Sequence, residues 1–142
     1  MTSFIGYDPK PFYINPIYLN PKYSFYTKLY IDPNNNYLTI NCVYDGLKEL
    51  PEIPRYLEVL YCGYNHLTEI PKLPNSLKIL YCELNQLTSL PKLPNSLQKL
   101  YCSNNKLRIL PELPNTLTYF TCENNKFIKN INYKYLEQFV YL

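Results

Sequence analysis

The chain repeats a stretch of twenty residues almost without change. The segment from Pro71 to Leu90 reads PKLPNSLKILYCELNQLTSL, and the segment from Pro91 to Leu110 reads PKLPNSLQKLYCSNNKLRIL. All five cysteines recur at the same spacing: Cys42, Cys62, Cys82, Cys102 and Cys122. Such a period is typical of a solenoid, in which each coil buries its apolar side only by stacking on its neighbours.

Each repeat has two parts. The first is Leu-x-x-Leu-x-Cys-x-x-Asn-x-Leu, the pattern of a leucine-rich repeat, in which one short strand is followed by a turn. The second is Leu-Pro-x-Leu-Pro, where two prolines three apart exclude a helix and favour an extended polyproline-type path. We therefore predict a leucine-rich-repeat solenoid, mainly β, with one short parallel strand per 20-residue coil and extended return arms.

The sequence divides the chain into three parts. Residues 1–36 are predicted to form an N-terminal cap, partly β and packed on the first coil, because an open first coil would expose a strand edge. Within them, the alternation from Tyr23 to Ile31 predicts a strand, and Asp32–Asn36 a turn. Five leucine-rich repeats follow over residues 37–128. Residues 129–142 are predicted to cap the other end, as a short helix or a degenerate strand.

The two-part motif resembles that of known proteins. The proline-containing arm joined to the Leu, Cys and Asn pattern is similar to the short repeats of bacterial type III effectors of the YopM and IpaH kind. It also resembles the leucine-rich-repeat proteins of giant DNA viruses. The resemblance implies a module that binds proteins without catalysis, directed at a host, with the host cytoplasm or a virion as its location.

Two columns of residues are expected to be structural. The five cysteines stand where an inward leucine or valine is usual, so we expect free thiols packed as small hydrophobes, without hydrogen-bond partners. They lack the short Cys-x2-Cys spacing of metal sites, and strands that are parallel and in register give poor disulfide geometry. The second column follows the strand and should pair backbone groups at the corner: Asp45, Asn65, Asn85, Asn105 and Asn125.

The outer face of the predicted strands, expected to be concave, is the candidate partner site. Residues that alternate with the inward Leu and Cys must point outward. Aromatic residues favour strands and pack on their lateral neighbours, but exposed aromatic patches also mark interfaces. The predicted partner-binding residues are Val59, Tyr61, Ile79, Tyr81, Lys99, Tyr101 and Tyr119.

Charge and residue types narrow the function. The net charge of +3 is spread along the repeats, which disfavours nucleic acid as a partner. Cys62 should point inward while His66, the one histidine, lies in the turn, so we expect no nucleophile–base pair, no catalytic residues and no cofactor. No apolar run has membrane-spanning length and the N-terminus lacks a signal-peptide run, so we expect an intracellular, cytoplasmic protein.

We therefore predict a protein–protein interaction module whose partner the sequence does not identify. Two alternatives stay open. One is a structural or virion-assembly component that self-associates through the C-terminal tail, and the other is a nucleic-acid binder.

Overall fold

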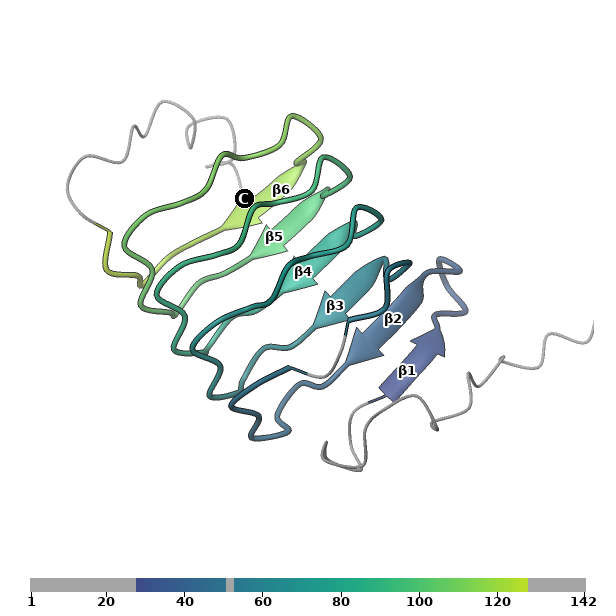
Figure 1. Ribbon diagram of the computed structural model, residues 1–142, viewed down its shortest axis with the longest axis horizontal. Helices are drawn as coiled ribbons and strands as arrows, with labels where there is room; N and C mark the ends of the chain where they lie inside the picture. The colour runs from purple at the N-terminus through teal and green to yellow at the C-terminus, as the bar shows by residue number, and fades with distance from the viewer. Residues whose placement is uncertain (1–27, 51–52, 128–142) are drawn as a thin grey trace, which may run out of the picture.

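The computed structural model describes residues 28–50 and 53–127, and these form one sheet of six short strands in chain order (Figure 1). The strands are β1 (Lys28–Ile31), β2 (Leu38–Asn41), β3 (Val59–Tyr61), β4 (Ile79–Tyr81), β5 (Lys99–Tyr101) and β6 (Tyr119–Thr121). β1 pairs antiparallel with β2, and all later neighbours pair in parallel. Over these described ranges there is no helix, and hence none that could cross a membrane.

Constant repeat length sets the register of the sheet. Leu60 lies opposite Leu80, and Leu80 opposite Leu100, so residues twenty apart stack directly on one another. These three side chains are fully buried, as are the leucines that precede and follow β3, β4 and β5. The predicted leucine-rich-repeat solenoid is confirmed, because identical positions of successive coils form a continuous apolar core.

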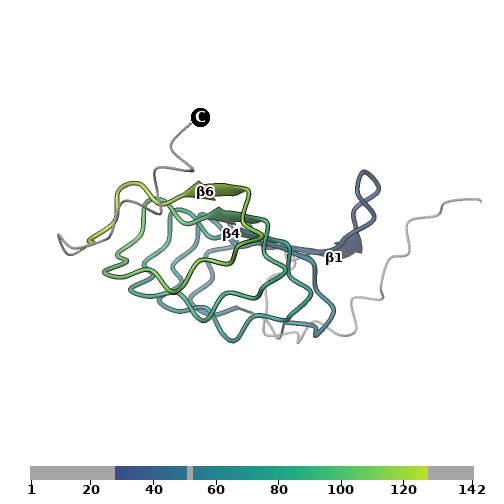
Figure 2. The ribbon, with the colours of Figure 1, turned by 90° about the horizontal axis from the view of Figure 1, so that it is seen from above.

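The return arms are extended, as the proline spacing predicts. In the arm between β3 and β4, Ile70 and Leu73 are buried, while Lys72 between them is exposed. Each arm ends in a turn closed by a backbone hydrogen bond across three residues, such as that from the Leu77 N–H to the Pro74 carbonyl at 3.1 Å. Figure 2 shows the strands along one side of the coils and the arms along the other, so each coil is a flattened loop.

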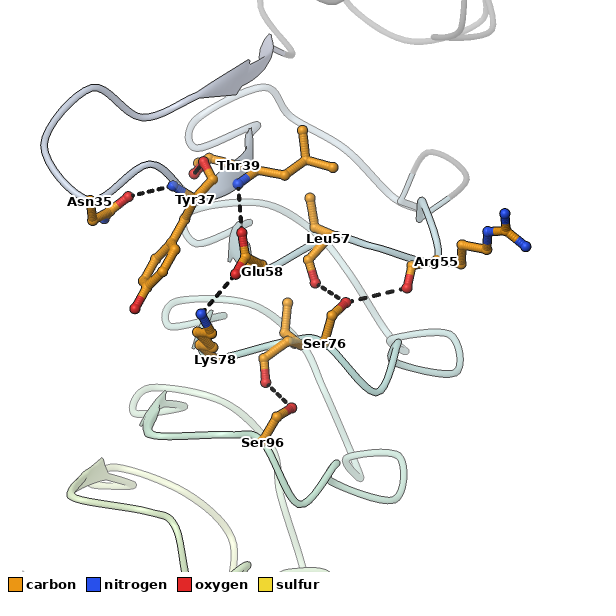
Figure 3. Close-up of polar contacts among 11 residues, drawn as sticks. Asn35, Tyr37, Thr39, Arg55, Leu57, Glu58, Ser76, Lys78 and Ser96 are labelled. Atoms are coloured by element: carbon orange, nitrogen blue, oxygen red, sulfur yellow. Dashed lines mark hydrogen bonds and ion pairs between the residues drawn. The ribbon is translucent and has the colours of Figure 1, made fainter.

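Hydroxyl side chains form a further column, at the corner that leads into each strand. The Ser76 hydroxyl donates to the Leu57 carbonyl of the preceding coil at 2.7 Å, and Ser96 donates to the Leu77 carbonyl at 2.6 Å (Figure 3). Thr116 repeats the contact with the Leu97 carbonyl. The sequence analysis missed this column, although its signal was present as Pro-Asn-Ser/Thr-Leu at the repeat period.

The strand and turn expected before the first repeat are present. The Asp32 carbonyl accepts the Asn36 N–H at 2.7 Å, and the Asp32 N–H donates to the Tyr37 carbonyl at 2.9 Å. Figure 2 shows this turn rising from the sheet on the side opposite the return arms. Residues 1–27 of the predicted N-terminal cap and the whole predicted C-terminal cap, 129–142, lie outside the described residues.

Candidate functional site

The cysteines form a column of free thiols in the core. Cys42, Cys62, Cys82 and Cys102 are at most 1% exposed, while Cys122 is partly exposed. Burial raises the pKa of the Cys42 thiol to about 12, with Asp45 adding to the effect, and it raises the pKa of Cys62 well above the ordinary value. These thiols are therefore protonated, and a protonated thiol is a poor nucleophile and a poor metal ligand.

The thiols differ from the expectation in one respect. The Cys82 Sγ donates to the Tyr101 carbonyl of the next coil at 3.3 Å, and the Cys102 Sγ donates to the Thr121 carbonyl at 3.2 Å. Cys42 makes the same contact with the Tyr61 carbonyl. The expectation that these positions offer no hydrogen-bond partner was wrong, because stacking places the next strand's carbonyl directly beside each Sγ.

The asparagine column joins each coil to the preceding one. The Asn85 Oδ1 accepts the Leu67 N–H at 3.0 Å, and its Nδ2 donates to the carbonyls of Cys62 and Cys82 at 3.0 and 3.2 Å. Asn65, Asn105 and Asn125 repeat this arrangement. An amide is suited to this corner because it donates and accepts at once.

Tyrosine rings form a continuous row on the outer face of the sheet, which we call the strand face. Ring centroids lie 6.3 Å apart for Tyr61 and Tyr81, 5.5 Å for Tyr81 and Tyr101, and 4.9 Å for Tyr101 and Tyr119. All four rings are partly exposed, and Lys99 beside them is exposed. The row is thus both packed laterally and open to solvent.

Tyr81 leans over the neighbouring coil rather than standing upright. A Cβ built on Gly63 would overlap the Tyr81 ring, so the ring occupies the space that any larger side chain would need there. Gly63 is itself buried. Because residue 63 is glycine and has no side chain, the Tyr81 ring can pack against this coil.

Glu83 joins this face in a way that the sequence analysis missed. Its Oε1 accepts the Thr121 hydroxyl at 2.9 Å, so the side chain reaches across one coil to β6. The pKa of Tyr81 is raised, first by burial and then by the charge and hydrogen bonding of Glu83. The same carboxylate contributes to the raised pKa of Tyr101, after burial and the neighbouring tyrosines.

The N-terminal end of the strand face is covered. Val59 is 1% exposed, so the prediction that it belongs to an open binding surface was wrong for this side chain. The turn of the β1–β2 hairpin rises on this same side of the sheet (Figure 2). The Tyr37 ring lies 4.0 Å from the Lys78 Nζ, and Tyr30 and Asp32 contribute, after burial, to the raised pKa of Tyr61.

The open part of the strand face therefore lies over β4, β5 and β6. Of the predicted partner-binding residues, the structure places Ile79, Tyr81, Lys99, Tyr101 and Tyr119 there. Tyr61 stands at its boundary with the hairpin.

A second exposed apolar area runs along the corner after the strands. Tyr44 and Tyr64 stack with ring centroids 4.2 Å apart, and both are exposed, as is Leu84 in the next coil. All three have left-handed backbone, with φ of 63°, 55° and 52°. Asparagine, which tolerates this conformation better, stands at the equivalent residues 104 and 124. The sequence analysis did not identify this column.

Cys62 and His66 lie in different environments. The Cys62 thiol is fully buried with a raised pKa, while the His66 side chain is exposed in the turn. Between residues 28 and 127, apart from the undescribed 51–52, no three His, Cys, Asp or Glu side chains gather so as to hold a metal ion.

Fold and face together define the chain as a leucine-rich-repeat solenoid of the short, 20-residue kind, which presents a row of tyrosines on its sheet. No protein-family model and no curated protein sequence matches it. Several solved structures are similar to it. YopM from Yersinia enterocolitica WA-314 is 45% identical over 61% of this chain, with a TM-score of 0.59. YopM from Yersinia pestis, a leucine-rich effector protein, is 44% identical over 61% of this chain, also with a TM-score of 0.59.

The leucine-rich-repeat domain of a Shigella effector is 34% identical over 66% of this chain, with a TM-score of 0.63. The expected likeness to bacterial effector repeats is therefore confirmed. The chain spans 20%, 25% and 43% of the lengths of the Y. enterocolitica, Y. pestis and Shigella chains. What is similar is thus the repeat region, which is a part of each of these structures.

Proposed function

We propose that this protein is a non-enzymatic interaction module that binds a protein partner through the open part of the strand face. The observation that carries the proposal is the row of partly exposed tyrosines on β4, β5 and the start of β6. The sheet beneath them is held coil to coil by the asparagine column, so the rings are presented on a rigid surface. Tyrosine is enriched among the residues that dominate binding energy at interfaces.

The likeness to Yersinia and Shigella effectors extends the proposal to a host protein as partner. Lys99 adds a solvated charge in the middle of the face, where it would influence partner choice and association rate more than affinity.

Site-specific photo-crosslinking in a host-cell extract tests the proposal. Lys99 and Lys92 belong to one coil and are both exposed, but Lys99 is on the strand face and Lys92 on the return arm. A photoreactive side chain replacing Lys99 is expected to give protein adducts of discrete mass, and the same side chain replacing Lys92 is not. Adducts from position 92 alone, or equally from both, would contradict the proposed face.

The mass of the adduct separates the alternatives. An adduct with the mass of a second copy would favour an assembly component, and an adduct with nucleic acid would favour the nucleic-acid binder. Once a partner is isolated, Lys99→Glu should change its association rate at low salt by about tenfold, while Lys92→Glu should leave that rate unchanged. Alanine replacement of several tyrosines is a poorer test, because their rings also pack against one another.

A further inference from the structure

Glu83 is a carboxylate placed among aromatic rings on the strand face. The Thr121 hydroxyl donates to its Oε1 at 2.9 Å, which fixes the carboxylate above the coil between β4 and β6. Ser103 of that intervening coil is only 5% exposed. The carboxylate is thus held in place before any partner arrives, which lowers the entropic cost of using it in binding.

No positive charge within the described residues neutralises this carboxylate. The ion pair on the neighbouring part of the sheet joins Lys78 and Glu58 at 2.7 Å, and Glu83 takes part in no such pair among residues 28–50 and 53–127. Lys99 is exposed on the adjacent strand, two residues before Tyr101. Glu83 comes two residues after Tyr81, which is the position that Ser103 has relative to Tyr101. Tyr101 therefore separates Lys99 from the side of the row on which Glu83 lies.

We propose that Glu83, with the rings of Tyr81 and Tyr101, forms a subsite for a basic side chain of the partner, and for arginine above all. The inference rests on the proposed function and specifies what the partner presents. The two rings lie 5.5 Å apart next to the carboxylate, and a planar guanidinium stacks on such a ring while donating to a carboxylate oxygen. The carboxylate takes the Thr121 hydroxyl and a hydrogen bond with Tyr81, and its two oxygens keep further acceptor capacity for that donor.

The competing interpretation is that Glu83 has only a structural role, through its hydrogen bond between the coils of β4 and β6. Glu83→Gln distinguishes the two, because glutamine keeps an acceptor for the Thr121 hydroxyl and removes the charge. The matched control is Glu112→Gln on the return arm, where the side chain is exposed on the opposite side of the coil. Thermal unfolding of each variant checks that folding is retained.

The test selects random linear peptides on the immobilised wild-type chain and on each variant, and sequences those retained. We expect arginine to be enriched about threefold or more on the wild type and on Glu112→Gln, and not on Glu83→Gln. Glu83→Lys should reverse the preference towards Asp and Glu, even if it loosens the contact with Thr121.

Equal arginine enrichment on wild type and Glu83→Gln would overturn the subsite. So would a wild-type chain that retains no peptides, or retains peptides without an excess of arginine, for example acidic ones drawn by Lys99. None of these outcomes affects the crosslinking result at position 99, by which the proposed function is judged separately.

Discussion

At the scale of the residue, the corner asparagines show how a side chain takes the place of backbone pairing. The strand ends after three residues, and the chain turns through a left-handed residue such as Leu84 (φ 52°). The carbonyls of Cys62 and Cys82 then lack a strand partner, and the Asn85 amide donates to both. A buried carbonyl or N–H without a partner is costly, so this one side chain stabilises two coils.

Asn85→Ala is expected to lower the free energy of unfolding by on the order of 1–3 kcal/mol, because the Leu67 N–H and two carbonyls lose their partners. Asn125→Ala should cost less, because Asn125 is partly exposed and water can replace its amide. Equilibrium unfolding in urea measures both values. Equal losses at the two positions would show that burial of the corner does not set the cost.

At the scale of the element, the strand face combines lateral packing with exposure. Three-residue strands present few side chains, so each ring lies against a ring of the next coil. Tyr81 additionally fills the space above Gly63. Consequently the tyrosine row is partly structural, and its shape depends on a small residue at position 63.

Gly63→Ala is expected to destabilise the protein by roughly 1–3 kcal/mol, because the new Cβ forces the Tyr81 ring out of its place. In a Tyr81→Ala background the same change should cost much less, since the ring is gone and alanine restricts the unfolded chain more than glycine does. A double-mutant cycle from urea unfolding gives the coupling. Additive effects would mean that the ring does not rest on Gly63.

At the scale of the whole molecule, stacking turns single positions into continuous columns. The thiol column is the clearest case, since four protonated, buried thiols lie in successive coils. Burial raises the pKa of Cys42 from the ordinary 9.0 to about 12, and it raises the pKa values of Cys62, Cys82 and Cys102 well above 9.0. Stability at alkaline pH is therefore a property of the entire stack.

The sign of this pH dependence follows from proton binding. Each thiol holds its proton more tightly in the folded state, so its contribution is fully present below about pH 9 and is lost as the pH rises towards the folded value, about 12 for Cys42. We expect the urea midpoint to fall steadily from pH 9 upwards. A Cys62→Ala, Cys82→Ala double variant should show a shallower fall. A midpoint that stays constant up to pH 11 would contradict buried, protonated thiols.

The sequence by itself determined the repeat architecture. A constant period of 20 makes every coil the same length, and coils of equal length stack in register, so columns of Cys, Asn and Tyr follow from their spacing alone. Two prolines in each arm likewise exclude a helical return without reference to any other part of the chain. The columns depend on interactions between residues one repeat apart, and the extended arm depends on the local restriction that proline imposes on the backbone.

Only the tertiary structure decided which part of the strand face stays open. Val59 has the strand position of Ile79 and Lys99, yet it is buried, and the turn that rises on this side precedes the first repeat. The contact of Glu83 with Thr121 spans two coils, so no comparison of neighbouring repeats predicts it. Periodicity describes what each coil shares with the next, whereas the candidate site depends on the residues in which the coils differ.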